Sequence, residues 1–313
     1  MGDAIARLFL RQQFDVVGLD MREGQSGAPF ETVLCDLRDA EQTTKTLSAM
    51  RPDIVIHLAA RTDLLERKSL NGYDSNISGV KNLIQGLKDA GGCSRVIYTS
   101  SQLVCKPGYQ PKTDTDYSPH NLYGESKVLT EKIVREHAAG VGAWCLTRPT
   151  TIWGPGMSPH YQSMLEYIEK GRYFHCGGSA LLKSYGYIEN SAWQYFCLAT
   201  APGDVVNEKT FYIADYDPIS LRRYADDIAG HLGAPAIRTY PLPFVRGLAY
   251  LGDSLNWIGW QAFPFNSFRL HNILTEYVFD TSELETICGP LPVSYEDAVV
   301  ATAEWYRNAR DAE

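Results

Sequence analysis

Tyr123 and Lys127 are the residues whose types and spacing could do chemistry, four positions apart in the segment YGESK, whose pattern predicts a helix. Side chains at this spacing share one helix face. A phenol with a pKa of about 10 is a poor base at neutral pH, and lowering that pKa by roughly three units requires about 4 kcal/mol of phenolate stabilisation. A neighbouring ammonium supplies part of this energy. The pair therefore suits proton transfer to or from an alcohol or ketone while a cofactor carries hydride, although the same spacing also occurs on solvated helix faces.

The composition and charge of the 313-residue chain narrow the function classes. A hydrophobic content of 44% is ordinary for a soluble globular enzyme and provides for a sizeable core. The net charge of -8 argues against general affinity for nucleic acids or anionic membranes, because phosphate binding needs concentrated positive charge. The seven cysteines are scattered and never form a C-x-x-C pair. We therefore expect no disulfide framework and no metal site, and reduced thiols favour a cytoplasmic protein.

The sequence also bears on membrane segments. Asp3 and Arg7 interrupt the start of the chain, where a signal peptide would need a long apolar run. The most apolar long stretch, residues 241–260, is broken by Arg246 and Asp253 and falls short of a membrane span. An amphipathic helix is our preferred interpretation of this stretch, and contact with a membrane surface is the alternative.

Apolar runs alternate with helical patterns through the first half of the chain. Alternating strands and helices predict parallel pairing with helices on both faces, which is a doubly wound α/β sheet. Ligands of such a sheet bind beyond the carboxyl ends of its strands. The predicted strands cover residues 14–20, 32–37, 53–60, 95–101 and 143–148. We expect the strands at 14–20 and 53–60 to be buried. The predicted helices cover residues 3–12, 39–50, 74–90 and 122–139.

The alternation weakens after Pro149, where Pro, Gly and aromatic residues become frequent. This change predicts a smaller, mostly helical part that binds the substrate. We assign residues 1–150 to the doubly wound domain and residues 151–313 mainly to the substrate-binding part. Residues 184–215 are expected to return to the first domain, because Thr210 to Ala214 has a strand-like pattern.

Short motifs accompany the predicted strands and helices, and most stand where a predicted strand ends. In chain order they are Asp20, Asp36-Leu37, His57-Leu58-Ala59-Ala60, Asn76 in NISGVKNL, Thr99-Ser100-Ser101, Tyr123 with Lys127, and Arg148-Pro149-Thr150 leading to Trp153-Gly154-Pro155.

In their order and spacing these motifs resemble the extended short-chain dehydrogenase/reductase superfamily, in its NAD-dependent epimerase/dehydratase group. The resemblance covers essentially the whole chain. It implies a Rossmann-like NAD-binding domain over residues 1–150 and an oxidoreductase that acts on a hydroxyl or keto group. It also implies a possible homodimer, in which each subunit contributes two helices to the interface. The helix of Tyr123 would be one of these two helices.

The resemblance assigns roles to the reactive side chains. Tyr123 becomes the general acid/base, while Lys127 lowers the phenol pKa and holds the nicotinamide ribose. Ser101 is expected to hydrogen-bond the substrate oxygen, and its neighbours Thr99 and Ser100 are the alternatives. Asn76 is expected to support Lys127 through its backbone or a water, with a plain helix-surface asparagine as the alternative.

The cofactor is expected to be NAD. Asp20 at a strand end would accept hydrogen bonds from the adenosine ribose and repel a 2′-phosphate, which favours NAD over NADP. Arg22, two residues on, weakens that preference, and an ordinary strand-ending acid is the alternative for Asp20. By resemblance the cofactor contacts Gly2, Asp20, Asp36, Leu37, Leu58, Ala59, Ala60, Asn76, Thr99, Tyr123, Lys127 and Pro149.

The start of the chain departs from the family pattern. Family members begin with a strand and a Gly-rich turn, whereas here only Gly2 matches the last glycine. That strand is central to the sheet and its turn holds the pyrophosphate. Its loss would cost more than the roughly 5 to 15 kcal/mol by which domains are stable. We therefore hypothesise a functional protein about a dozen residues longer, which the codons upstream of Met1 would test.

The substrate side leaves two enzymes open. Where nucleotide-sugar enzymes of the family often carry Arg, Lys183 keeps a cation for a phosphate without the bidentate fork. The tail from PLPFVRGLAYLGDSLNWIG to TEYVFD is similar to the 3β-hydroxysteroid dehydrogenase branch. A nucleotide sugar is our preferred substrate, a hydroxysteroid is the alternative, and a non-catalytic dinucleotide sensor or scaffold is the alternative of another class. The candidate substrate contacts are Ser101, Gln102, His160, Tyr161, Lys183 and Arg269.

Overall fold

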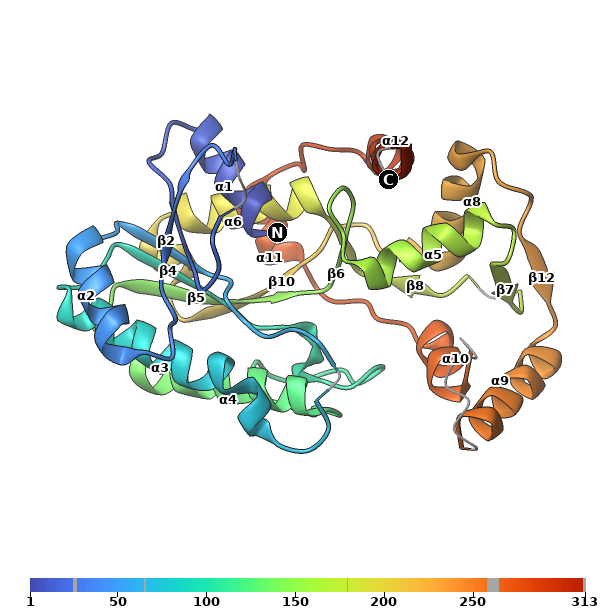
Figure 1. The fold of residues 1–313 in the computed structure, drawn as a ribbon, viewed down its shortest axis with the longest axis horizontal. Coiled ribbons are helices and arrows are strands. Elements are labelled where there is room, and N and C mark those ends of the chain that lie inside the picture. Colours follow the sequence, from blue (N-terminus) through green and yellow to red (C-terminus); the bar gives the residue numbers. More distant parts are fainter. Residues whose placement is uncertain (25–26, 65, 179, 258–264, 312–313) are drawn as a thin grey trace. The chain divides into compact units, whose positions relative to one another are not determined.

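A computed structural model describes residues 1–24, 27–64, 66–178, 180–257 and 265–311 (Figure 1). The chain forms two compact units. The first comprises Met1–Thr150, Ile188–Ala214 and Asp280–Pro292, and the second comprises Thr151–Tyr187, Asp215–Phe279 and Val293–Glu313.

Parallel strands form the centre of the first unit. A four-stranded sheet has the order β10-β5-β4-β3, and β1 and β2 form a separate parallel pair. The predicted α/β class with a parallel sheet is confirmed. The strands are β1 (Val17–Asp20), β2 (Glu31–Leu34), β3 (Ile54–His57), β4 (Arg95–Thr99), β5 (Ala143–Pro149) and β10 (Lys209–Ile213).

Helices cover both faces of the four-stranded sheet. Figure 1 shows α2, α3 and α4 on one face and α1, α6 and α11 on the other. A core of Leu, Ile, Val and Trp side chains from α2, α3, α4, β4 and β5 fills the first of these layers. The elements are α1 (Gly2–Arg11), α2 (Ala40–Met50), α3 (Asp74–Asp89), α4 (Leu122–His137), α6 (Ile188–Thr200), α7 (Gly203–Val206), α11 (Ser282–Cys288) and the 3-10 helices η1 (Leu70–Tyr73) and η2 (Gln102–Val104).

Two strands are less buried than the sequence predicts. Val17 in β1 is 43% exposed, and in β3 only His57 is buried, while the other three residues are half-buried. Among the described strands, β1 pairs only with β2 and β3 only with β4, so each has one edge without a neighbouring strand. An apolar run forms a buried strand only where neighbouring strands and helices cover it. Because β1 and β3 each have an edge without a neighbouring strand, the predicted burial at 14–20 and 53–60 is wrong.

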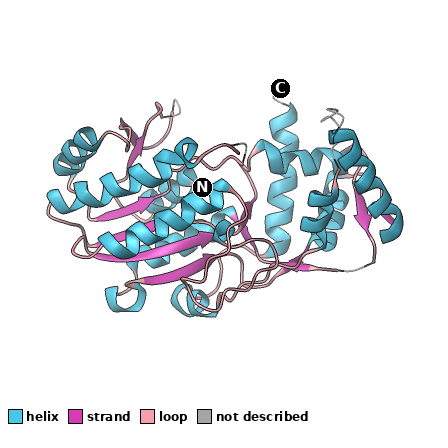
Figure 2. Ribbon diagram, turned by 90° about the horizontal axis from the view of Figure 1, so that it is seen from below, coloured by secondary structure: helices cyan, strands magenta, loops and turns pink. Residues whose placement is uncertain are grey.

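In the described residues, the second unit consists mainly of helices (Figure 2), and its strands form three short pairs. The ring of Trp153 lies 5.2 Å from that of Tyr187 and 5.0 Å from that of Tyr224, which joins the first strand pair to α8. None of the helices in the described ranges is long and apolar enough to cross a membrane. The elements are β6 (Thr151–Trp153), α5 (Pro159–Glu169), β7 (Phe174–Cys176), β8 (Leu182–Lys183), β9 (Tyr185–Tyr187), β11 (Ile219–Ser220), α8 (Leu221–Leu232), β12 (Arg238–Tyr240), α9 (Leu242–Trp257), α10 (Ser267–Leu274) and α12 (Tyr295–Asp311).

Candidate active site

The helix that carries Tyr123 and Lys127 begins at a capped N-terminus. The Gly124 N–H donates a hydrogen bond to Asn121 Oδ1 at 2.7 Å, which satisfies one of the free N–H groups of the first turn. Both reactive side chains lie on the buried part of α4, with Tyr123 8% and Lys127 3% exposed. The structure therefore places the phenol and the ammonium one helical turn apart in the interior of the first unit.

Lys127 is tied to the end of β4. Its Nζ donates a hydrogen bond to the backbone O of Thr99 at 3.0 Å. Burial lowers the pKa of Lys127 to about 8, and the charge of Glu131 opposes that shift. The ammonium form still predominates at neutral pH, and two of its three N–H donors remain for a ligand.

The structure distinguishes among the three hydroxyls at the carboxyl end of β4, which are those of Thr99, Ser100 and Ser101. Thr99 Oγ1 shares a hydrogen bond with Tyr195 OH at 2.8 Å, and Ser100 Oγ donates to Glu131 Oε1 at 2.6 Å. Ser101 Oγ accepts a hydrogen bond from the Leu103 N–H at 3.1 Å, which leaves its own proton available to donate. These contacts favour Ser101 over Thr99 and Ser100 as the hydroxyl that meets a substrate.

Gly124 permits close packing between α4 and the η2 turn after Ser101. A Cβ on Gly124 would lie under 3.0 Å from the backbone O of Leu103, a separation that real Cβ atoms essentially never show. The glycine between Tyr123 and Glu125 therefore sets the distance between the helix and the strand end.

We expect Gly124→Ala to push α4 away from η2. The clash is with backbone, so the variant should lose about 1 to 3 kcal/mol of unfolding free energy and most of its turnover. The matched control is Gly230→Ala in α8, where a Cβ meets no atom within 4 Å and where alanine should add about 0.5 to 1 kcal/mol. Urea denaturation measures both variants, and a Gly124→Ala protein of wild-type stability would contradict the packing described here.

Candidate cofactor residues follow the ends of the strands. The carboxyl ends of β3, β4 and β5 share one sheet edge, which brings Leu58, Ala59 and Ala60 together with Thr99 and the buried Pro149. A Cβ on Gly2 would lie 3.7 Å from Leu58 Cδ1, so α1 begins beside the turn after β3.

Asp20, which ends β1, and Asp36, which follows β2, lie in different surroundings. Asp20 is exposed and its Oδ1 accepts a hydrogen bond from the Arg22 N–H at 3.0 Å. The carboxylate of Asp36 is held by the Arg38 guanidinium at 2.5 to 3.0 Å, which lowers the pKa of Asp36, and Leu37 follows half-buried. An exposed carboxylate at Asp20 fits a ribose, while the carboxylate of Asp36 is already bound by Arg38.

Asn76 is 1% exposed, so the alternative of a helix-surface asparagine is wrong. Its Nδ2 donates to Ser126 Oγ at 3.0 Å, and its backbone O accepts from Thr130 Oγ1 at 2.7 Å. These two residues flank Lys127 on α4. Asn76 therefore holds α3 against the helix that carries the ammonium.

Four of the candidate substrate residues belong to the second unit. Lys183 Nζ donates to the backbone O of Asn272 at 2.5 Å and lies 4.9 Å from the ring centroid of Tyr277. Burial lowers the pKa of Lys183 to about 8. Lys183 thus caps the carboxyl end of α10. Tyr161 and Arg269 are exposed on α5 and α10, and the side chain of His160 lies outside the described residues.

The remaining substrate candidates, Ser101 and Gln102, lie in the first unit. Gln102 begins η2 directly after Ser101 and is half-buried. Its position beside Ser101 keeps it a candidate contact for a substrate.

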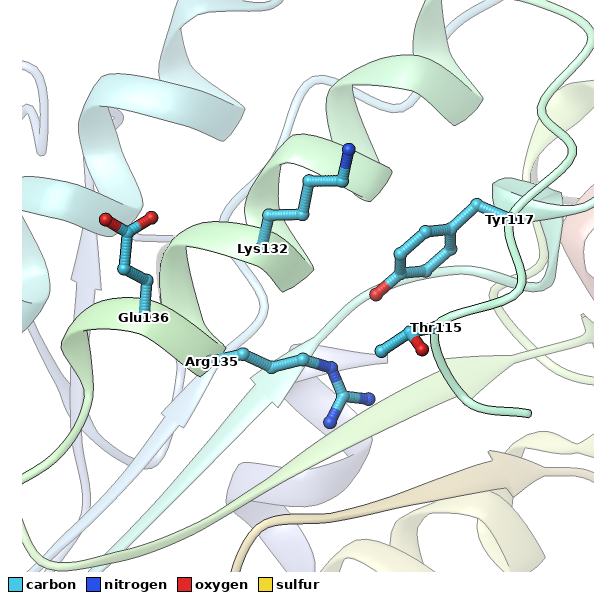
Figure 3. Close-up of a pocket in the computed structure, with 5 residues that line it drawn as sticks. All are labelled: Thr115, Tyr117, Lys132, Arg135 and Glu136. Carbon is cyan, nitrogen blue, oxygen red and sulfur yellow. The ribbon is translucent and has the colours of Figure 1, made fainter.

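The sequence analysis did not predict the buried ion pair between Glu131 and Arg148, which lies next to Lys127. Glu131, one turn after Lys127, accepts hydrogen bonds from Arg148 Nε and Nη2, both at 2.8 Å. The available signal was an acid four residues after Lys127 on the same helix face. Figure 3 shows Tyr117 in the lining of a surface cavity of about 520 Å³. The OH of Tyr117 donates a hydrogen bond to Glu131 Oε2 at 3.0 Å, so this side chain connects the cavity to the ion pair. The cavity is lined by Thr115, Tyr117, Lys132, Arg135 and Glu136.

The chain is similar to several known proteins. A family model described as the NAD dependent epimerase/dehydratase family matches residues 1–214. A 3beta-hydroxysteroid-dehydrogenase/decarboxylase, isoform 2, of Arabidopsis thaliana is 26% identical over 297 residues, which cover 87% of this chain and 51% of the relative. The chain therefore spans about half the length of that protein.

Two further similarities concern epimerases. The N-acetyl-alpha-D-glucosaminyl-diphospho-ditrans,octacis-undecaprenol 4-epimerase of Escherichia coli is 24% identical over 93% of this chain and 88% of the relative. The structure of Thermus thermophilus UDP-glucose 4-epimerase in complex with NAD superposes with a TM-score of 0.71 at 18% identity, covering 98% of this chain and 96% of that one. The second similarity shows a shared fold.

Proposed function

Since the chain belongs to the NAD-dependent epimerase/dehydratase family, we propose that Ser101, Tyr123 and Lys127 form its proton-transfer centre for oxidation of a hydroxyl group. One observation carries the proposal. The buried ammonium of Lys127 lies one helical turn from Tyr123 and is anchored to the backbone of the strand end that precedes Ser101.

Each side chain has one task in this reaction. Tyr123 takes the proton of the substrate hydroxyl and returns it to the oxygen when the ketone is reduced again. Lys127, still charged at neutral pH, stabilises the phenolate of Tyr123. Ser101 donates its hydroxyl proton to the substrate oxygen. Bound NAD would supply the hydride acceptor.

Several observations fit NAD at the first unit. Asp20 offers an exposed carboxylate to a ribose, and Ala59 and Ala60 allow the backbone after β3 to approach a ligand closely. Lys127 keeps two donors for the second ribose. We assign cofactor binding to the first unit and substrate binding mainly to the second. NAD rather than NADP is favoured by the charge of Asp20. A cytoplasmic location and a homodimer stay predictions.

A nucleotide sugar is the preferred substrate, and relatives named as sugar 4-epimerases support it. A hydroxysteroid is the second candidate. It is supported by the name of the Arabidopsis relative and by an apolar cluster of the second unit in which Val245 and Ala249 of α9 pack on Leu270 of α10. Lys183 donates one hydrogen bond to the backbone O of Asn272, and its remaining N–H donors keep it a candidate contact for a sugar diphosphate.

The two substrates predict different NADH stoichiometry. An epimerase returns the hydride to its substrate and accumulates no NADH, whereas a dehydrogenase forms one NADH per ketone. We expect one class in a panel of UDP-, GDP- and dTDP-sugars and hydroxysteroids to turn over, with the product identified by chromatography, which separates epimers of equal mass, and NADH followed by absorbance. NAD binding without turnover of any member would favour the non-catalytic sensor or scaffold instead.

A further inference from the structure

We infer that Glu131 is a positioning residue that locks the strand end bearing Ser101 against the helix bearing Tyr123 and Lys127. The inference rests on the proposed function of those three residues. Glu131 has no role in that proposal and is fully buried, so it acts only through the groups it binds.

The carboxylate of Glu131 accepts four hydrogen bonds. Oε1 accepts from Ser100 Oγ at 2.6 Å and from Arg148 Nε at 2.8 Å. Oε2 accepts from Arg148 Nη2 at 2.8 Å and from Tyr117 OH at 3.0 Å. The donors come from the end of β4, from β5 and from the loop before α4. One side chain of α4 therefore joins three separate segments.

Arg148 keeps the buried charge of Glu131 compensated. Its Nη2 also donates to the backbone O of Asp114 at 2.5 Å, and its Nη1 donates to Tyr212 OH at 3.2 Å. A buried charge pair is tolerated only when its remaining donors and acceptors are satisfied, and here the protein satisfies them. The pair is therefore a rigid anchor.

Successive residues of the strand end are held by successive turns of α4. The backbone O of Thr99 binds Lys127 Nζ, and the hydroxyl of Ser100 binds Glu131, four residues later. One attachment would allow the helix to pivot about it, whereas two fix its orientation as well. Ser101 is the next residue along the strand, so its position relative to Tyr123 is set by both attachments.

Glu131 also acts on Lys127 through its charge. The charged and titratable groups around Lys127 are Tyr123 and Glu131 on its own helix, His57 from β3, and Arg148 from β5 beside Glu131. Burial and the charge of Lys127 lower the pKa of His57 to about 3, so His57 is neutral. Tyr195 from α6 reaches the strand end through Thr99 Oγ1 and is also neutral, since burial raises its pKa. Glu131 is thus the nearby group that keeps Lys127 protonated.

The test compares Glu131→Gln with Glu125→Gln, the same change at an exposed position of α4. With the substrate found in the panel, Glu131→Gln should lower kcat by about 10- to 100-fold at nearly unchanged KM for NAD. It should also move the alkaline limb of the kcat profile about one pH unit lower, because Lys127 loses its proton more easily. Glu125→Gln should match the wild type in both.

Loss of one charge of a buried pair can prevent folding, so a second variant leaves the pair intact. Ser100→Ala removes one attachment and should lower kcat about tenfold at unchanged KM, and Ser100→Thr should restore it by returning the hydroxyl. If Glu131→Gln fails to fold, the kcat values of the Ser100 variants alone test the positioning role of Glu131. Wild-type kcat in Ser100→Ala, or an unmoved pH profile in a folded Glu131→Gln, would overturn the inference. A wild-type enzyme without turnover would contradict the proposed function, and the inference with it.

Discussion

Replacing Lys127 with methionine is expected to abolish turnover while making the protein more stable at neutral pH. Without the ammonium, the phenolate of Tyr123 loses its stabilising charge, and turnover should fall by about 10²- to 10⁴-fold. Methionine keeps a similar length and fills the same buried space.

The gain in stability follows from the pKa of Lys127. Burial lowers this pKa from 10.5 to about 8, so the folded protein holds the proton less tightly than the unfolded chain. The resulting cost to folding is present in full below pH 8 and disappears as the pH rises to 10.5. After loss of the hydrogen bond to Thr99, the net gain of Lys127→Met at pH 7 should be about 2 kcal/mol.

Urea denaturation at pH 7 and at pH 10 measures this gain and its decline. Lys132→Met, on the exposed side of the same helix, is the control and should change neither stability nor turnover. A Lys127→Met protein that is less stable than the wild type at pH 7 would show that burial of the ammonium does not destabilise the folded protein.

The Tyr123→Phe variant should lose turnover by about 10²- to 10⁴-fold, because the proton acceptor is gone. The ring remains and keeps its contact with Tyr73, whose centroid lies 5.9 Å away, so stability and NAD affinity should be nearly unchanged. Calorimetric titration measures NAD affinity, and the screened substrate measures turnover.

Tyr73→Phe is the matched control for the loss of a phenol hydroxyl. Tyr73 is fully buried and its OH donates to the backbone O of Asp63 at 2.6 Å, so that this variant should lose about 1 kcal/mol of stability. It should keep its turnover. Equal losses of turnover in the two variants would assign the effect to packing.

Local pattern was enough to place the elements that carry the site. The periodicity of residues 122–139 predicted α4, and the apolar run at 95–101 predicted β4, because both elements are covered by the same core. The burial of β1 and β3 was not predictable, since it depends on which strands pair rather than on the apolar run itself.

The contacts that organise the site depend on tertiary structure. Nothing in the sequence pairs Glu131 with Arg148. Charged residues are rarely fully buried, so their residue types predict that both side chains lie at the surface. The choice of Ser101 over Ser100 likewise depends on which hydroxyl Glu131 engages. Lys183 shows the same limit, because nothing in the sequence places its ammonium at the carboxyl end of α10. The longer N-terminus remains a prediction.

The most direct measurement is a single turnover with enzyme and NAD in excess over substrate, in which conversion of the substrate to product is followed by chromatography in wild type and Tyr123→Phe. With Tyr123 as the acid/base, the substrate should be converted rapidly by the wild type and about 10²- to 10⁴-fold more slowly by the variant, although both are saturated with NAD. Conversion at the wild-type rate in Tyr123→Phe would contradict the assignment of proton transfer to Tyr123.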